Sequence, residues 1–254
     1  MKKPLIVLTG PTAVGKTKLS IALAKAVNGE IISADSMQVY RHMDIGSAKI
    51  TPEEMDGVPH HLVDVLEPTE DFNIVLFQQM AKDAMDKIYD KGRIPILVGG
   101  TGFYIQSVTR DIDFTSSDQD EHYRRELEEL AEQKGPAFLH DMLAKVDPKS
   151  AEDIHENNVK RVIRALEFYK QNGTRISEHN EEQKKHTSPY ALAYFVLNAP
   201  RPLLYERIDT RVDEMLKNGL TEEVKKLREM GCHRGMVSML SLIHISEPTR
   251  PERI

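Results

Sequence analysis

The chain has little cysteine and no long apolar stretch. Cys232 is the single cysteine among 254 residues. One thiol excludes an internal disulfide and suits a reducing compartment, and we expect Cys232 to be a small buried residue. No apolar run is long enough to cross a bilayer, and no signal peptide precedes the first predicted strand. Both observations favour a cytoplasmic protein without a membrane anchor.

The chain also lacks an excess of positive charge. The 34 Lys and Arg residues against 40 Asp and Glu give a net charge of −6. This balance excludes a global basic field, so any contact with RNA must come from a local patch. With 40% hydrophobic residues, the chain is long enough for one large or two modest domains with a real core.

What the sequence does contain is a phosphate-binding pattern near its N-terminus. The P-loop pattern G-x-x-x-x-G-K-[ST] is met by Gly10, Pro11, Thr12, Ala13, Val14, Gly15, Lys16 and Thr17. The apolar run 5–8 predicts a buried strand before the loop, and 16–27 predicts a helix after it. Strand, loop and helix together disfavour a chance glycine turn. The inward face of the helix is expected at Leu19, Leu23, Ala26 and Val27.

Each part of this loop has a chemical use. Gly10 and Gly15 allow successive backbone N–H groups to point at an anion, and the helix N-terminus adds partial positive charge. The Lys16 ammonium is suited to neutralise the outer phosphate. The Thr17 hydroxyl is suited to bind Mg²⁺.

A second predicted strand, 30–34, ends at Asp35. Ligands of open α/β sheets bind beyond the carboxyl ends of strands, so Asp35 is expected near whatever the phosphates are attached to. Three roles fit it: a ligand of Mg²⁺ through water, a general base, or the N-cap of a short helix. His60 and His61 come later, and neighbours on a strand point to opposite faces, which favours structural roles over one shared metal.

A third strand, 94–98, follows a predicted amphipathic helix at 73–89 and runs into Gly99-Gly100-Thr101-Gly102. A glycine cluster at the carboxyl end of a strand suggests close approach of backbone to a ligand, with Thr101 offering a hydroxyl. The alternative is a tight turn without a ligand.

Residues 115–187 are helical in pattern and contain no clear strand. Helices are predicted at 121–134, 136–145 and 158–171, and 173–188 has the composition of a loop. The basic side chains of this segment either hold an RNA backbone or form a solvated helix face. They are Arg124, Arg125, Lys160, Arg161 and Arg164.

The sheet resumes at 191–197, and helices follow at 202–218 and 221–230. Arg207 and Arg211 lie one helical turn apart, where two guanidinium groups either clamp a diphosphate or pair with nearby carboxylates. The predicted fold is α/β, a P-loop NTPase-like parallel sheet flanked by helices. Its core is discontinuous, 1–114 and 188–239, around an all-helical insertion at 115–187.

Several segments together match one family closely. They are GPTAVGKT at 10–17, IISADSMQVYRHMDIGSAK at 31–49, GVPHHLVD at 57–64, PILVGGTGFYIQ at 95–106 and NNVKRVIRALEFY at 157–169. On these segments the chain resembles the tRNA dimethylallyltransferases, also called tRNA isopentenyltransferases. The resemblance covers about residues 4–239, and the segment around DSMQVYR separates this family from ordinary nucleotide kinases.

The resemblance implies an activity and its parts. A dimethylallyl group passes from dimethylallyl diphosphate to N6 of a flipped adenine beside the tRNA anticodon. The P-loop and Mg²⁺ hold the donor diphosphate, Lys16 stabilises its charge, Asp35 is the general base, and Thr101 contacts the adenine or the donor. Residues bordering the acceptor nucleotide are Ser36, Met37 and Gln38. The anticodon stem-loop is held by Lys160, Arg161 and Arg164, with Arg124 a weaker match, and we expect a monomer.

The chain departs from the family pattern after Met239. Residues 240–254 have two prolines, no helical period and no family likeness. We therefore expect a truncated gene whose last residues are not native, with a face left uncovered and activity weak or absent.

Three alternatives share the same motifs. An adenylate isopentenyltransferase would prenylate a free nucleotide, and a P-loop kinase of small substrates would bind ATP and have a lid arginine. A regulator that binds RNA with a vestigial P-loop would show no transfer at all.

Overall fold

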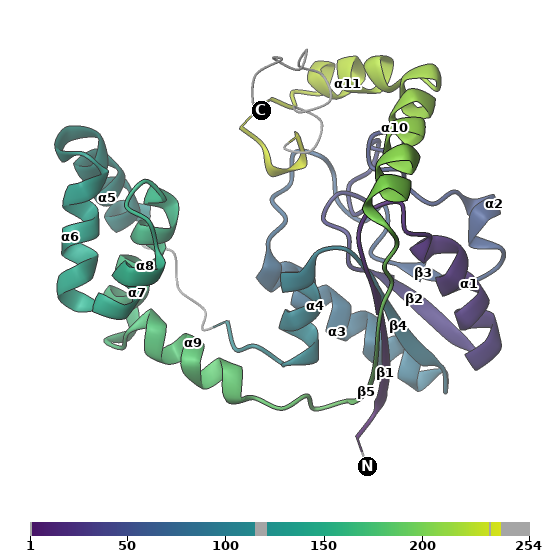
Figure 1. The fold of residues 1–254 in the computed structure, drawn as a ribbon, viewed down its shortest axis with the longest axis horizontal. Helices are drawn as coiled ribbons and strands as arrows, with labels where there is room; N and C mark the ends of the chain where they lie inside the picture. The colour runs from purple at the N-terminus through teal and green to yellow at the C-terminus, as the bar shows by residue number, and fades with distance from the viewer. Residues whose placement is uncertain (1, 115–120, 234, 240–254) are drawn as a thin grey trace. The chain divides into compact units, whose positions relative to one another are not determined.

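The computed structural model describes residues 2–114, 121–233 and 235–239, and Figure 1 shows their path. The chain divides into two compact units. The first comprises Met1–Asp111 with Ser188–Ile254, and the second comprises Ile112–Thr187. The segment 240–254, predicted to be foreign to the protein, lies outside the described residues.

The first unit is built on a parallel sheet, which confirms the predicted α/β class. Its strands are β1 (Pro4–Thr9), β2 (Gly29–Ser33), β3 (His60–His61), β4 (Ile94–Gly99) and β5 (Ala191–Val196), in the order β3-β2-β4-β1-β5. Thr9 pairs with Gly99 and Ser33 with Val98. Because parallel strands end at one edge of the sheet, the loops after β1, β2 and β4 emerge side by side.

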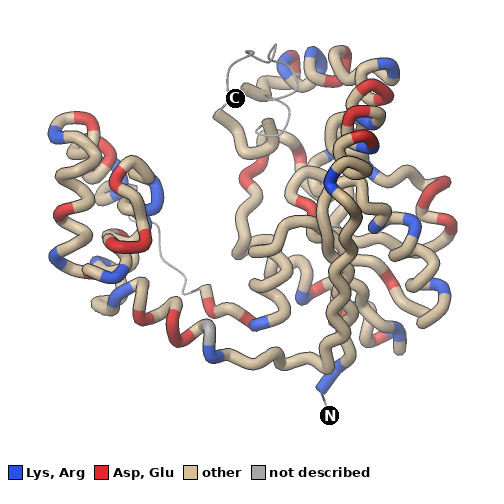
Figure 2. The backbone as a smooth tube through the Cα atoms, viewed as in Figure 1, with Lys and Arg blue, Asp and Glu red and all other residues tan. Residues whose placement is uncertain are grey.

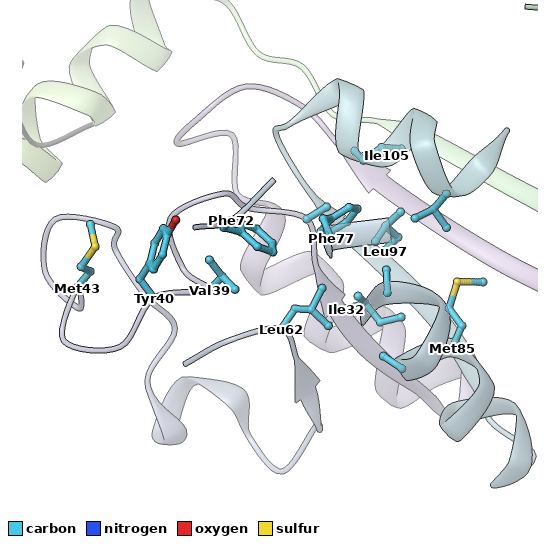
Figure 3. Packing of buried hydrophobic residues seen from close by; sticks show 14 of the residues in the cluster. Ile32, Val39, Tyr40, Met43, Leu62, Phe72, Phe77, Met85, Leu97 and Ile105 are labelled. Atoms are coloured by element: carbon cyan, nitrogen blue, oxygen red, sulfur yellow. The ribbon is translucent and has the colours of Figure 1, made fainter. Parts of the chain in front are cut away.

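Helices cover both faces of this sheet. The unit contains α1 (Lys16–Val27), α2 (Pro52–Met55), α3 (Ile74–Asp90), α4 (Gly102–Thr109), α10 (Arg201–Lys217) and α11 (Leu220–Glu229). Figure 3 shows Phe77 of α3 and Ile105 of α4 packed against Leu97 of β4, within the largest buried cluster. A separate cluster on the other face joins Ala24 of α1 to Ile31 and Ile96.

One expected helix face is wrong in part. Residues Ser20 and Ala24 are the buried positions of α1, whereas Leu19 is 44% exposed and Ala26 is also exposed. The rotation of α1 about its axis is set by its packing against β2 and β4 and by the glycine loop that delivers it, and apolar character alone does not report these constraints.

The second unit is entirely helical in its described residues and has its own core. It contains α5 (Glu121–Lys134), α6 (Pro136–Val146), α7 (Pro148–Asp153), α8 (Val159–Asn172) and α9 (Ile176–Lys185). Its buried cluster is formed by Leu127, Leu139, Leu143, Val162, Ile163, Ala165 and Leu166. The predicted loop at 173–188 is wrong, because α9 occupies most of it. Its polar sequence carries little periodicity, and contacts with α7 and α8 hold it in place.

Asp147 joins two of these helices from a fully buried position. Its carboxylate accepts from the Ser150 N–H at 3.1 Å and hydroxyl at 2.7 Å, and from the Ser177 N–H at 3.0 Å and hydroxyl at 2.6 Å. Burial alone would raise the pKa of Asp147, but hydrogen bonds from Ser177 and Ser150 outweigh it and hold the pKa below the ordinary value of 3.8.

We expect Asp147→Ala to destabilise the second unit by about 3 kcal/mol, because it leaves four buried hydrogen-bond donors without an acceptor. A carboxylate with a lowered folded pKa stabilises above its unfolded pKa, and this stabilisation is lost as pH falls through the folded pKa. The variant should therefore be less stable at neutral pH and lose less further stability in acid. Urea unfolding from pH 7 to pH 3, with exposed Asp141→Ala as control, measures both effects. Equal stability of the two variants at pH 7 would contradict this role.

Candidate active site

The P-loop has the backbone geometry of an anion-binding turn. Gly10, Ala13 and Gly15 all have positive φ angles, of 150°, 62° and 97°. A Cβ at Gly10 would lie 2.5 Å from the Leu197 carbonyl oxygen, so only glycine fits there. The Lys16 ammonium donates to the carbonyl oxygens of Gly10 at 2.9 Å and Pro11 at 2.7 Å. The lysine is thus folded back over its own loop, at the N-terminus of α1.

A cavity of about 60 Å³ lies at the carboxyl edge of the sheet beside this loop. It brings Lys16 and Thr17 of α1 together with Asp35 and Gln38, which follow β2. The remaining lining residues are Ser20, Ile31, Ser33, Ile50, His60, Val98 and Gly99. The chain segments after β1 and after β2 therefore share one hollow, with a cation and a carboxylate on its wall.

Asp35 is held by a local turn and lines the cavity as well. Its Oδ1 accepts from the backbone N–H groups of Met37 at 2.9 Å and Gln38 at 3.4 Å. No helix begins at Ser36, so the carboxylate caps a turn rather than the short helix considered from the sequence. Gln38 is fixed in turn, because its side-chain N–H donates to the Ala48 carbonyl at 3.3 Å.

Burial and the charges of two other segments act on Lys16. Burial lowers the pKa of Lys16, the Asp35 carboxylate opposes this by raising it, and Arg211 lowers it further. Arg207, one turn before Arg211 on α10, donates from Nη1 to the Ala13 carbonyl at 3.3 Å. Both arginines predicted to bind a diphosphate thus lie close enough to the P-loop to affect it, one by contact and one by charge.

The glycine cluster after β4 forms the next part of this edge. A Cβ at Gly99 would lie 2.2 Å from the Ala34 carbonyl oxygen. Glycine is therefore required at position 99, because the backbone at the end of the neighbouring strand lies too close for a side chain. Thr101 precedes α4, and its hydroxyl makes no capping hydrogen bond with that helix.

Tyr104, one helical turn after Thr101, lies near Asp35 but is not among the site residues predicted from the sequence. Burial and the charge of Asp35 raise its pKa, and its ring stacks on Phe77 at 4.4 Å. The sequence signal for Tyr104 is its position three residues after Thr101, which places the two side chains on the same side of a helix.

The histidine pair makes structural contacts. His61 Nε2 lies 2.7 Å from the Glu30 carboxylate, which is fully buried and also pairs with Lys91 at 3.1 Å and Arg93 at 2.8 Å. His60 Nδ1 lies 2.8 Å from the Val58 carbonyl. Within the described ranges, no group of three or more His, Cys, Asp or Glu side chains is arranged to hold a metal.

The basic residues of the helical unit differ in their surroundings. Arg124 forms a two-pronged contact with Glu167, at 2.9 Å and 2.8 Å, and this carboxylate is only 2% exposed. Arg124 therefore ties α5 to α8. Lys160 and Arg161 are exposed in the first turn of α8, and Arg164 is half-buried one turn on. Figure 2 shows basic and acidic residues interspersed along the helices of this unit.

These features define a class: an α/β protein of the P-loop type, in which a carboxylate and the P-loop lysine line one cavity at the carboxyl edge of the sheet. The chain belongs to the IPP transferase family, whose model matches residues 38–247. Among the described residues, no helix is both long and apolar enough to cross a membrane.

Known proteins similar to this chain bear related names. It is 64% identical to a tRNA dimethylallyltransferase of Lachnoclostridium phytofermentans, over 94% of this chain and 77% of that protein. A crystal structure of the tRNA isopentenylpyrophosphate transferase of Bacillus halodurans is similar with a TM-score of 0.66 and 49% identity, over 94% of this chain and 74% of that one. A eukaryotic dimethylallyltransferase acting on tRNA has a TM-score of 0.80 and 37% identity, over 90% and 56%.

Proposed function

We propose that this protein transfers a dimethylallyl group from dimethylallyl diphosphate to N6 of an adenine beside the anticodon of tRNA, and releases diphosphate. The observation that carries the proposal is that Lys16 and Thr17 of the P-loop line the same cavity as Asp35. Prenyl transfer to an amine requires a donor half, which binds the diphosphate, and an acceptor half, which removes the proton of the amine. The phosphate-binding loop and the carboxylate on one cavity can supply these two halves. The family membership of the chain supports the same reaction.

The donor half lies on the P-loop and α10. The loop N–H groups, the Lys16 ammonium and the guanidinium groups of Arg207 and Arg211 bind the diphosphate and stabilise its charge as the C–O bond breaks. The Thr17 hydroxyl and the Asp35 carboxylate lining one cavity are oxygen donors of the kind that Mg²⁺ prefers beside substrate phosphates. Thr17 would hold this ion, which supplies further positive charge to the diphosphate when bound.

The acceptor half lies after β2 and β4. The adenine N6 forms a bond to the allylic carbon, the electron pair of the broken C–O bond leaves with diphosphate, and the N6 proton passes to the Asp35 carboxylate. Ser36, Met37 and Gln38 border the flipped base, with the Thr101 hydroxyl beside it. In the helical unit, Lys160, Arg161 and Arg164 contact phosphates of the anticodon stem-loop, whereas Arg124 serves mainly to hold Glu167.

The test is incubation of the protein with Mg²⁺, labelled dimethylallyl diphosphate and unmodified tRNA. We expect label on tRNA, in the small amount that a truncated chain would give, and none on free AMP. Label on AMP and not on tRNA would overturn the proposal in favour of a free-nucleotide enzyme. Phosphate transfer from ATP would favour a kinase, and tRNA binding without transfer would indicate a binding protein.

We also propose that the protein acts as a cytoplasmic monomer. Size-exclusion chromatography tests the oligomeric state.

A further inference from the structure

The loop between β2 and α2 forms part of the cavity at both of its ends. We name residues 36–50 the acceptor loop. Gln38 near its start and Ile50 at its end both line the cavity. The described residues between them contain no strand or helix, so side chains must supply many of the contacts that fix this loop.

A distant helix supplies the most concentrated of these contacts. Glu223 of α11 is 9% exposed. Its Oε2 accepts from the backbone N–H groups of Asp44 and Ile45, both at 2.8 Å, and its Oε1 accepts from Gly46 at 2.9 Å. Three successive N–H groups converging on one carboxylate form a short, charge-assisted set of bonds.

Both ends of this contact are rigidly held. Leu220 and Leu227 of α11 lie in the same buried cluster as Met43 of the acceptor loop, and Figure 3 shows Met43 beside Tyr40. The Lys49 side chain is 4% exposed, and its ammonium donates to the Tyr40 carbonyl at 2.7 Å and to the Asp44 and Asp64 carboxylates at 2.6 and 2.5 Å. Glu223 thus fixes the middle of a loop whose other turns are already tied together.

The contacts continue from this point to the cavity. The Ala48 N–H donates to the Ile45 carbonyl at 3.0 Å, and the Ala48 carbonyl accepts from the Gln38 side chain at 3.3 Å. A displacement of 44–46 therefore moves the partner that orients Gln38. None of the hydrogen bonds named for Lys16, Gly10 or Arg207 involves this loop.

We propose that Glu223 is a positioning residue for the acceptor side of the site. The proposal rests on the proposed function, because it assigns Gln38 and its loop to the incoming tRNA nucleotide. Glu223 holds the acceptor loop in the shape that receives the base, and it leaves the donor site unaffected. A purely structural role would instead weaken donor and acceptor binding together.

The matched pair of variants is Glu223→Ala and Glu222→Ala. Both residues are acidic and lie in the first turn of α11, so both changes remove the same charge from the same helix end, but Glu222 is exposed. We expect kcat/KM for tRNA to fall by about 10- to 100-fold in Glu223→Ala relative to Glu222→Ala, since a small misplacement of a reacting group is costly. The Kd for dimethylallyl diphosphate should be the same in both.

Hydrogen exchange supplies a readout that does not depend on turnover. The amides of residues 44–46 should exchange faster in Glu223→Ala, with the amides of β2 and β4 unchanged. Glu223→Gln retains the side-chain length but presents an amide N–H₂ to these donors, and it gives the same readouts should the alanine variant not fold.

Two results would overturn the positioning role. One is unchanged exchange at 44–46 in both Glu223 variants. The other is faster exchange with tRNA kinetics equal to those of Glu222→Ala, or with donor affinity lost in parallel. Absence of transfer by the wild-type chain would count against the proposed function instead, and the Kd for tRNA of Glu223→Ala against Glu222→Ala would then decide the positioning role.

Discussion

Replacing Asp35 with asparagine is expected to lower kcat for prenyl transfer by about 10²- to 10⁴-fold, the usual contribution of a general base. The attacking adenine amine is weakly basic and must lose a proton as the new bond forms. The Asp35 carboxylate lines the cavity together with Lys16, and it is the one carboxylate among the lining residues given above. Single-turnover kinetics with labelled donor and saturating tRNA measures this step.

Asparagine is the informative replacement because it preserves the local fold. The Asp35 Oδ1 accepts from Met37 and Gln38, and an amide oxygen can accept the same two bonds. Asp35→Ala would remove the turn as well as the base, so a larger loss of tRNA binding in that variant would report the turn. Asp83→Asn, exposed on α3, controls for the lost charge. A kcat within about threefold of the control would exclude Asp35 as the base.

How far the sequence predicts this site depends on the range of the contacts involved. The P-loop strand, turn and helix are local, and β1 (Pro4–Thr9) and α1 (Lys16–Val27) follow the predicted elements closely. The parallel sheet follows from the alternation of strands and helices. The shared cavity follows from the rule that ligands bind at the carboxyl edge, which places Asp35 near the loop without any knowledge of contacts.

The parts that the sequence does not reveal depend on partners far along the chain. The pairing of Arg124 with Glu167 makes this arginine structural, and no local pattern indicates it. The bond of Glu223 to residues 44–46 joins segments separated by about 180 positions. The helix α9 is stabilised by the buried Asp147 and by packing of Phe168 on His179. Each case is a tertiary contact that overrides a weak or misleading local signal.

Replacing Lys16 with methionine is expected to lower kcat/KM for dimethylallyl diphosphate by about 10²- to 10³-fold, the loss typical for one preorganised group that stabilises developing negative charge. The Lys16 ammonium is poised over the loop by bonds to Gly10 and Pro11 that a diphosphate would replace. Lys18→Met removes the same charge from an exposed position on the same helix, and it should change kcat/KM by less than about twofold. Equal losses in the two variants would show a general charge effect and no specific role for Lys16.

The alkaline pH dependence separates the role of Lys16 from that of its neighbours. Burial lowers the pKa of Lys16, Asp35 raises it, and Arg211 lowers it again, with a net value below the ordinary 10.5. Only the ammonium form attracts the diphosphate, so donor binding is complete below this pKa and is lost as pH rises through it. Lys16→Met should lack this alkaline loss of donor binding.

Asp35→Asn removes the one charge that raises the pKa of Lys16. Donor binding by this variant should therefore begin to fall at a lower pH than donor binding by the wild type. A pH titration of donor Kd in the three proteins measures the coupling between the two sides of the cavity, and identical alkaline limbs in wild type and Asp35→Asn would place the carboxylate too far from the ammonium for the proposed chemistry.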